Sequence, residues 1–233
     1  MNVIFLPYAG GSQYSYSGFT GAAKRNGINI IPIEVPGRGS RINEPLLVNI
    51  SDMVNDIFDQ VKDHLKAPYG IYGHSMGTIL GYLLTRKIVN ENLNKPCHLF
   101  FSGSGGPSVK DQQVLRHLLP RKDFIDNLIK LGGCPEEILN DKYMMDIFEP
   151  IIRADFRLIE THRHEVEVAL DIPITVMIGT EDKISRAEAE AWQAETEKKI
   201  EIIKFPGGHF FIFGQEGKII EIILRKIKGQ QYG

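Results

Sequence analysis

The amino-acid sequence predicts an α/β fold: a mostly parallel sheet with helices on both faces. Strand-like and helix-like segments alternate along most of the 233 residues, which is the pattern of repeated β-α-β units. The strand-like segments are short, nearly continuous apolar runs, as expected for strands buried on both faces of a sheet. They cover residues 3–6, 27–35, 69–72, 98–102, 175–178 and 200–205.

Helix-like segments lie between several of these strands, at residues 50–65, 77–90 and 187–198. The last stretch, 218–228, places Lys and Arg side chains around an Ile-rich face. We therefore expect an amphipathic helix that packs on the sheet, not one that binds a membrane. The chain has no repeat or low-complexity linker, so we predict a single domain over residues 1–233.

A Gly-x-Ser-x-Gly motif at residues 73–77 (GHSMG) is the first indication of chemistry. It follows the strand at 69–72 and opens the helix at 77–90. This context is typical of a nucleophile elbow, in which a sharp turn exposes a serine hydroxyl, here that of Ser75. The following helix directs backbone N–H groups toward a developing oxyanion, and the residue after the nucleophile, Met76, supplies one of them.

Two further polar residues follow later strands in the order that this motif requires. Asp182 comes just after the strand at 175–178, and His209 follows the strand at 200–205 and the turn Pro206-Gly207-Gly208. The chain order Ser, Asp, His is that of the α/β-hydrolase fold. Each residue lies beyond the carboxyl end of a strand, where open α/β sheets bind ligands. His209 would act as the base for Ser75, and Asp182 would hold its tautomer.

Other side chains were weighed for the same roles. Glu181 is adjacent to Asp182 and stays an alternative for orienting the histidine, whereas Asp171 precedes its strand, at the wrong end of the sheet. His74 neighbours Ser75, but adjacent side chains diverge on a tight turn, so we expect a structural role. We expect the same for His64, His98, His117, His162 and His164. The spacing of the last two is not that of a helix-borne metal pair, and Gly10-Gly11 lacks nucleotide-motif spacing, so no metal or cofactor site is predicted.

Five segments, spread over roughly residues 2–223, resemble the type II (external) thioesterases that accompany non-ribosomal peptide and polyketide synthases. In order they are FLPYAGGS (5–12), VPGRGSR (35–41), GHSMG (73–77), ADF (154–156) and GGHFF (207–211). The resemblance implies a second oxyanion donor at the Ala9 backbone N–H. It also implies a substrate: an acyl group on the phosphopantetheine arm of an acyl- or peptidyl-carrier protein domain. Thr78 departs from the family pattern, which often has a smaller residue there.

The predicted reaction is hydrolysis of a thioester through an acyl-serine intermediate, which would edit misprimed or stalled synthases in antibiotic biosynthesis. The protein itself would need no cofactor, because the phosphopantetheine arrives on the partner. An acyl-CoA or small-ester hydrolase of the same fold remains an alternative, as does a releasing cyclase or acyltransferase. A non-catalytic module that binds carrier proteins is a further alternative, disfavoured by the complete set of Ser75, Asp182 and His209.

About seventy residues separate the strands at 98–102 and 175–178, far more than a β-α-β crossover needs. The segment shows helical patterns at 123–131, 135–139 and 142–164, with Asp123 as an N-cap and Pro135 in a first turn. We expect a lid over the active site at about 105–150, with Phe124 and Leu128 lining the acyl pocket. A second small packing unit is the alternative. Arg38 and Arg41 would anchor their loop or meet an acidic carrier protein, and Asp155 would join lid to core.

Bulk properties exclude several function classes. The net charge of −2 gives no electrostatic footprint for nucleic acid. No apolar run approaches the roughly 20 residues that span a bilayer, and the N-terminus lacks the basic region of a signal peptide. With only Cys97 and Cys134, we expect a cytoplasmic monomer with reduced thiols.

Overall fold

A six-stranded parallel sheet forms the centre of the computed structural model, which describes residues 1–66, 68–109, 114–134 and 136–230. All five strand pairings are parallel and the strand order is β2-β1-β3-β4-β5-β6. The predicted fold class is therefore confirmed. The strands are β1 (Asn2–Leu6), β2 (Asn29–Pro32), β3 (Tyr69–His74), β4 (His98–Ser102), β5 (Ile174–Gly179) and β6 (Glu201–Phe205).

The prediction of a long second strand at 27–35 was wrong. Gly27 has a φ of 67° and belongs to the turn after the preceding helix, so β2 begins only at Asn29. The strand lies at the edge of the sheet and ends at Pro32, which has no N–H to donate to a ladder. Both effects shorten an edge strand whose apolar pattern continues on either side.

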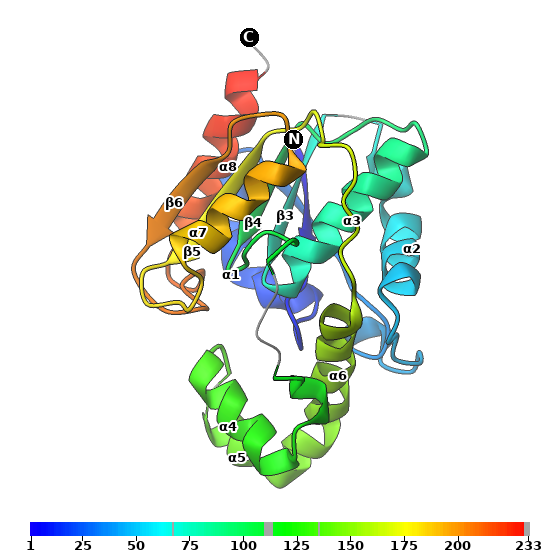
Figure 1. Cartoon of the computed structure of the whole chain (residues 1–233), viewed down its shortest axis with the longest axis vertical. Coiled ribbons are helices and arrows are strands. Elements are labelled where there is room, and N and C mark those ends of the chain that lie inside the picture. Colours follow the sequence, from blue (N-terminus) through cyan, green and yellow to red (C-terminus); the bar gives the residue numbers. More distant parts are fainter. Residues whose placement is uncertain (67, 110–113, 135, 231–233) are drawn as a thin grey trace.

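Helices cover both faces of the sheet (Figure 1). On one face, α2 (Ile50–Val61) and α3 (Met76–Asn90) bury apolar side chains against the sheet. On the other, α1 (Ser17–Arg25) and α8 (Glu216–Gln230) do the same, and α8 uses its row of isoleucines as the amphipathic pattern predicts. No helix in the described ranges is long and apolar enough to cross a membrane.

One predicted helix is replaced by two shorter elements. The segment at 187–198 folds as α7 (Arg186–Glu190) followed by a 3-10 turn, Ala191–Glu195, which buries Trp192 completely. The Trp192 ring packs against Phe101 of β4, with 4.6 Å between the ring centroids. Further 3-10 turns lie at Gln13–Tyr16, Gly39–Arg41, Lys62–His64 and Arg116–Leu118.

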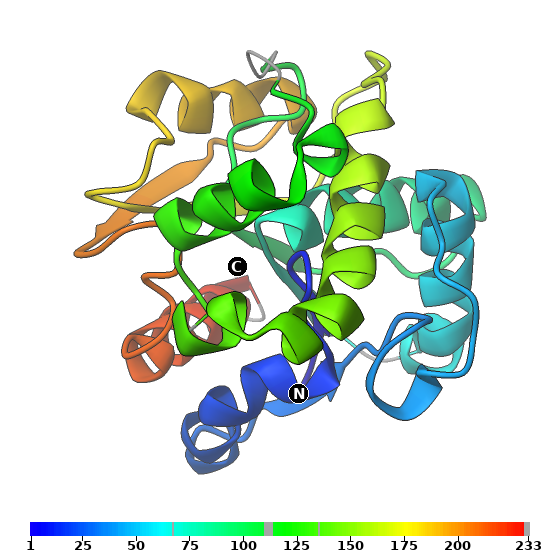
Figure 2. The ribbon, with the colours of Figure 1, turned by 90° about the horizontal axis from the view of Figure 1, so that it is seen from below.

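The inserted segment forms α4 (Arg121–Leu131), α5 (Glu136–Asn140) and α6 (Lys142–Thr161). These helices lie below the sheet in Figure 1, and Figure 2, seen from that side, shows them in front of it. They enclose their own apolar cluster, which also contacts Ala9 in the loop after β1. The segment therefore covers the carboxyl ends of the strands.

Two details of the inserted segment differ from expectation. Helix α4 begins at Arg121 with Pro120 at its N-cap, so Asp123 lies inside the first turn, where its charge favours the positive end of the helix dipole. Helix α6 continues through Pro150, so the expected boundary at 150 falls within a helix. Pro135 lies outside the described residues, and the prediction that it occupies a first turn stays a prediction.

Candidate active site

The GHSMG segment forms a strained turn between β3 and α3. Ser75 has a φ of 53° and a ψ of −117°, a conformation that non-glycine residues rarely adopt. A Cβ on Gly73 would lie 2.1 Å from the carbonyl oxygen of Gly77, and a Cβ on Gly77 would lie 2.6 Å from that of Leu6. Both glycines are therefore required for the close approach of strand, turn and helix.

Two hydrogen bonds hold the turn in place. The N–H of Ser75 donates to the Ser102 carbonyl oxygen at the end of β4 (2.8 Å), and the hydroxyl of Thr78 donates to the Ser75 carbonyl oxygen (2.7 Å). The Ser75 residue stays partly exposed. Helix α3 begins at Met76, whose N–H has no acceptor within its own helix, so it can donate to a ligand beside Ser75.

Asp182 and His209 come together at the ends of β5 and β6. The Nδ1 atom of His209 lies 3.0 Å from Oδ2 of Asp182, and both side chains are at least nine-tenths buried. A Cβ on Gly179 would lie 2.4 Å from the carbonyl oxygen of Gly208, so the two loops can approach only because residue 179 is glycine. The neighbouring Glu181 side chain is exposed and is not hydrogen-bonded to the histidine.

This pairing sets the tautomer of His209. An ionised carboxylate only accepts hydrogen bonds, so Nδ1 carries the proton and Nε2 presents a lone pair. Nε2 is buried and has no hydrogen-bond partner among the residues that the structure describes. An imidazole in this state can accept a proton from a hydroxyl group.

His74 lies behind this histidine and serves the packing, as expected. It is fully buried, its Nδ1 is 3.0 Å from the Ser102 hydroxyl, and that hydroxyl also bonds Tyr72. Burial, with a smaller contribution from the adjacent His209, holds the pKa of His74 well below its usual value. The buried His74 ring is therefore neutral and packs beside His209.

The loop after β1 lies beside the start of α3, because Gly77 packs against the Leu6 and Pro7 carbonyl groups. Ala9 lies two residues beyond Pro7 and is partly exposed. The loop is closed by a hydrogen bond from the Gly11 N–H to the Tyr8 carbonyl oxygen (2.8 Å).

Phe124 and Leu128 lie inside the cluster formed by α4, α5 and α6. Phe124 is fully buried against Phe156 and beneath the Arg153 guanidinium, and Leu128 is 7 % exposed. Ala9 packs against the same cluster. The two side chains thus form the interior of the inserted helices, next to the loop after β1.

The PGRGSR segment is anchored by ion pairs. This agrees with the expectation that Arg38 and Arg41 anchor their loop. Arg38 binds Asp155 of α6 through both guanidinium NH2 groups, at 2.6 and 2.7 Å, and Arg41 binds Asp56 and Glu44. Asp155 thereby joins the inserted helices to the core. The additional contact of Asp155 with Gly10, and the bonds made by Ser102 and Thr78, were not predicted, because no local pattern marks them.

Three of the remaining histidines, His98, His117 and His164, form pairwise contacts in different parts of the molecule. His117 contacts Glu160 at 2.6 Å and His164 contacts Glu195 at 3.1 Å. His98 lies 2.9 Å from the Thr175 hydroxyl, and burial, aided by Lys226, lowers its pKa to about 3. No group of three or more His, Cys, Asp or Glu side chains suited to a metal ion occurs within the described parts of the chain.

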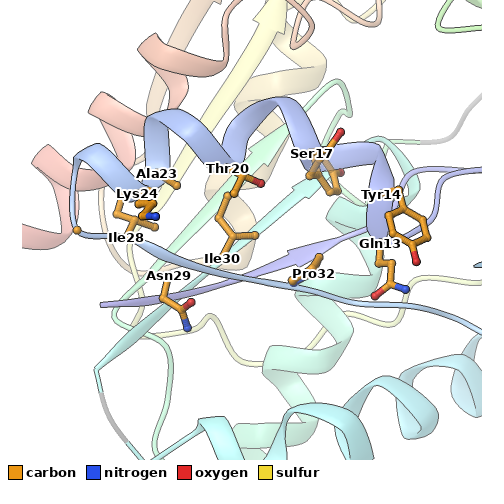
Figure 3. A pocket seen from close by; sticks show the side chains of 12 residues that line it. Gln13, Tyr14, Ser17, Thr20, Ala23, Lys24, Ile28, Asn29, Ile30 and Pro32 are labelled. Carbon is orange, nitrogen blue, oxygen red and sulfur yellow. The ribbon is translucent and has the colours of Figure 1, made fainter. Parts of the chain in front are cut away.

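A surface pocket of about 560 Å³ lies away from these residues, between α1 and β2 (Figure 3). Thr20 and Lys24 of the helix and Ile30 of the strand point into it. Ser75, Asp182 and His209 do not line it. The pocket is a feature of the sheet edge, separate from the group at the carboxyl ends of the strands.

Known proteins resemble this chain over nearly its whole length. The thioesterase domain family matches residues 1–228. The gramicidin S biosynthesis protein GrsT of Aneurinibacillus migulanus is 30% identical over 229 residues, which cover 98% of this chain and 89% of that protein. The crystal structure of ClbQ from the colibactin pathway superimposes with a TM-score of 0.92 at 33% identity, covering 99% of this chain and 98% of the other. BorB, a type II thioesterase from the borrelidin cluster, superimposes with a TM-score of 0.88 at 29% identity. The match covers 97% of this chain and 92% of BorB.

Proposed function

This chain belongs to the thioesterase domain family, and we propose that it hydrolyses acyl groups from the phosphopantetheine arm of carrier proteins. The observation that carries this proposal is the buried contact between His209 and Asp182, with the His209 ring beside that of His74, the residue that precedes the strained turn of Ser75. Similarity to GrsT, ClbQ and BorB, whose names refer to gramicidin S biosynthesis, the colibactin NRPS/PKS pathway and the borrelidin cluster, supports a substrate on a synthase.

In the proposed reaction, Ser75 Oγ attacks the thioester carbonyl carbon while Nε2 of His209 takes the hydroxyl proton. Asp182 keeps Nδ1 protonated and stabilises the imidazolium that forms. The N–H groups of Met76 and Ala9 bind the oxyanion of the tetrahedral intermediate. Collapse expels the pantetheine thiolate, a weakly basic leaving group that takes up the proton from the His209 imidazolium. The neutral His209 then removes a proton from water as the water oxygen attacks the acyl-serine carbonyl carbon, and it returns this proton to Ser75 Oγ as the acid leaves.

We further propose that α4, α5 and α6 act as a lid, which extends beyond the expected boundary at 150 to the end of α6, and that Phe124 and Leu128 shape the acyl pocket. Their position over the carboxyl ends of the strands supports this (Figures 1 and 2). A lid can open to admit a long pantetheine arm and then close over the bound acyl group. The burial of both side chains means that they would act by setting the shape of the lid interior.

The remaining parts of the proposal concern the setting of the reaction. The enzyme would need no cofactor of its own, because the phosphopantetheine is carried by its partner. We propose that the enzyme acts as a monomer. The free thiols of Cys97 and Cys134 support a cytoplasmic location. The role would be to remove misprimed or stalled acyl groups.

The substrate class is tested by comparing one acyl group on three carriers: an acyl-carrier protein, coenzyme A and a simple ester. We expect kcat/KM for the carrier protein to exceed the other two by at least about ten-fold, or 1.4 kcal/mol of additional transition-state binding. Equal values for coenzyme A would favour a general acyl-CoA hydrolase. Transfer to an alcohol or amine in product analysis would indicate a cyclase or acyltransferase.

A further inference from the structure

One carboxylate on the lid helix α6 holds the loop that follows β1. Asp155 is fully buried, and its Oδ2 accepts the Gly10 N–H at 2.8 Å and an Arg38 NH2 group at 2.6 Å. Its Oδ1 accepts the other Arg38 NH2 group at 2.7 Å. Arg38 is 4 % exposed and also donates to the Gly11 carbonyl oxygen at 3.2 Å. Asp155 and Arg38 therefore hold residues 10 and 11 from two sides.

These contacts determine the orientation of the two peptide groups that flank Ala9. The Asp155 bond to the Gly10 N–H fixes the Ala9–Gly10 peptide plane. The Gly11 N–H donates to the Tyr8 carbonyl oxygen at 2.8 Å, which fixes the Tyr8–Ala9 plane. Because a trans peptide is planar, its N–H points opposite to its C=O, and the direction of the Ala9 N–H is thereby set.

The packing around this loop removes its remaining freedom. Gly10 has a φ of 77°, and a Cβ there would lie 2.9 Å from Cγ1 of Ile152, one turn before Asp155 on α6. On the other side, the Tyr8 ring packs edge-on against Phe210, at 5.0 Å between centroids. The loop is thus enclosed between α6 and the segment that carries His209.

A buried ion pair of this kind is weak evidence for stability, since an apolar pair of similar volume is often as stable. A hydrogen-bond donor aimed at an oxyanion, in contrast, loses much of its effect when its direction shifts. The ion pair of Asp155 and Arg38 is therefore better explained by its effect on the geometry of the loop after β1 than by a contribution to the stability of the fold.

We propose that Asp155 and Arg38 are positioning residues for the oxyanion hole: they hold the Ala9 N–H toward the oxygen of the carbonyl group whose carbon Ser75 attacks. This rests on the proposed function insofar as Ala9 is an oxyanion donor. These contacts couple α6 to the loop after β1, so that a displacement of α6 would also move the Ala9 N–H.

The test uses the full chain and a small thioester, S-acetyl-N-acetylcysteamine, so that it does not depend on the carrier protein. Hydrolysis of this substrate by the wild type, without preference for a carrier protein, would overturn only the proposed substrate class. In Asp155→Asn we expect kcat to fall by roughly 10²-fold, as for loss of one oxyanion donor, with KM changed less than about three-fold. Asp56→Asn is the matched control, because Asp56 also binds an arginine in a two-pronged ion pair but does not contact the loop.

A second measurement separates positioning from general damage to the fold. An acyl trifluoromethyl ketone captures Ser75 Oγ as a hemiketal whose oxyanion occupies the hole, whereas a non-hydrolysable thioether analogue mimics only the bound substrate. We expect Asp155→Asn to weaken trifluoromethyl ketone binding in proportion to kcat and to leave thioether binding unchanged. Equal weakening of both, or a fall in kcat with unchanged ketone binding, would overturn the proposal.

Removal of one partner leaves a buried charge and can unfold the chain, so the double variant Arg38→Met/Asp155→Leu is included. Because the double variant removes both charges together, its melting temperature is expected to lie above that of Asp155→Asn. A folded double variant with the low kcat of Asp155→Asn supports positioning. A folded double variant with wild-type kcat overturns it.

Discussion

The rings of His74 and His209 lie side by side, with centroids 5.0 Å apart and planes inclined by 46°. A Cβ on Gly103 would lie 2.5 Å from His74 Cε1 and 3.3 Å from His209 Cε1, so only glycine fits beside the pair. Burial keeps the pKa of His74 low. A neutral imidazole therefore supports the proposed base without placing a second positive charge next to it.

The burial of two neutral histidines predicts how stability depends on pH. His74 and His98 both have lowered pKa values in the folded state, His98 to about 3, whereas an unfolded histidine titrates near 6.5. The unfolded chain binds more protons in acid, so the free energy of unfolding falls as the pH drops below about 6.5. His98 should contribute a loss of about 1 kcal/mol between pH 6 and pH 5, and His74 should contribute a loss in the same direction.

Urea unfolding at several pH values checks this expectation. In His98→Gln the loss of stability between pH 6 and pH 5 should be smaller by about 1 kcal/mol, whatever the effect of the substitution at pH 8. His64→Gln, at an exposed position, is the control and should keep the wild-type slope. An unchanged slope in His98→Gln would show that another group is responsible for the acid sensitivity.

Ser75→Ala should abolish nearly all thioesterase activity while the protein stays folded, because only a partly exposed hydroxyl is removed. We expect a fall in kcat of roughly 10³-fold or more, measured as acid released from an acyl-carrier protein. Ser104→Ala is the control, because the Ser104 hydroxyl donates to the carbonyl oxygen of the next residue, Gly105. A Ser75→Ala enzyme with a tenth of wild-type turnover would contradict the assignment.

Asp182→Asn should lower kcat by about 10²–10⁴-fold, since an amide no longer holds the required tautomer of His209. Glu181→Gln changes the adjacent, exposed carboxylate and should leave kcat within about two-fold of wild type. Steady-state turnover of both variants at one pH is sufficient. The reverse ranking would transfer the role to Glu181.

Leu128→Phe tests whether the lid interior shapes the acyl pocket. If it does, the larger ring should penalise long acyl chains relative to acetyl by about ten-fold in kcat/KM, the value of roughly one methylene contact. The site is 7 % exposed, so overpacking should also lower the melting temperature. A lowered melting temperature with an unchanged chain-length ratio would mean that the cluster only packs the lid.

The types and order of most helices and strands could be predicted from the amino-acid sequence, and so could the nucleophile elbow at Ser75. Apolar runs and glycine spacing are local properties, so β3, the Ser75 turn and α3 could be predicted from adjacent residues. The order of Asp182 and His209 after successive strands was also readable, because parallel strands bring their carboxyl ends to one edge.

Two features became known only from the three-dimensional structure. One is which of two adjacent carboxylates contacts His209, and the other is which residue holds the loop after β1. Asp182 and Glu181 are neighbours in sequence, but backbone packing at Gly179 turns one toward the histidine and the other toward solvent. Asp155 bonds Gly10 across 145 positions. Such contacts depend on how helices and loops dock in three dimensions, and no local periodicity or spacing carries that information.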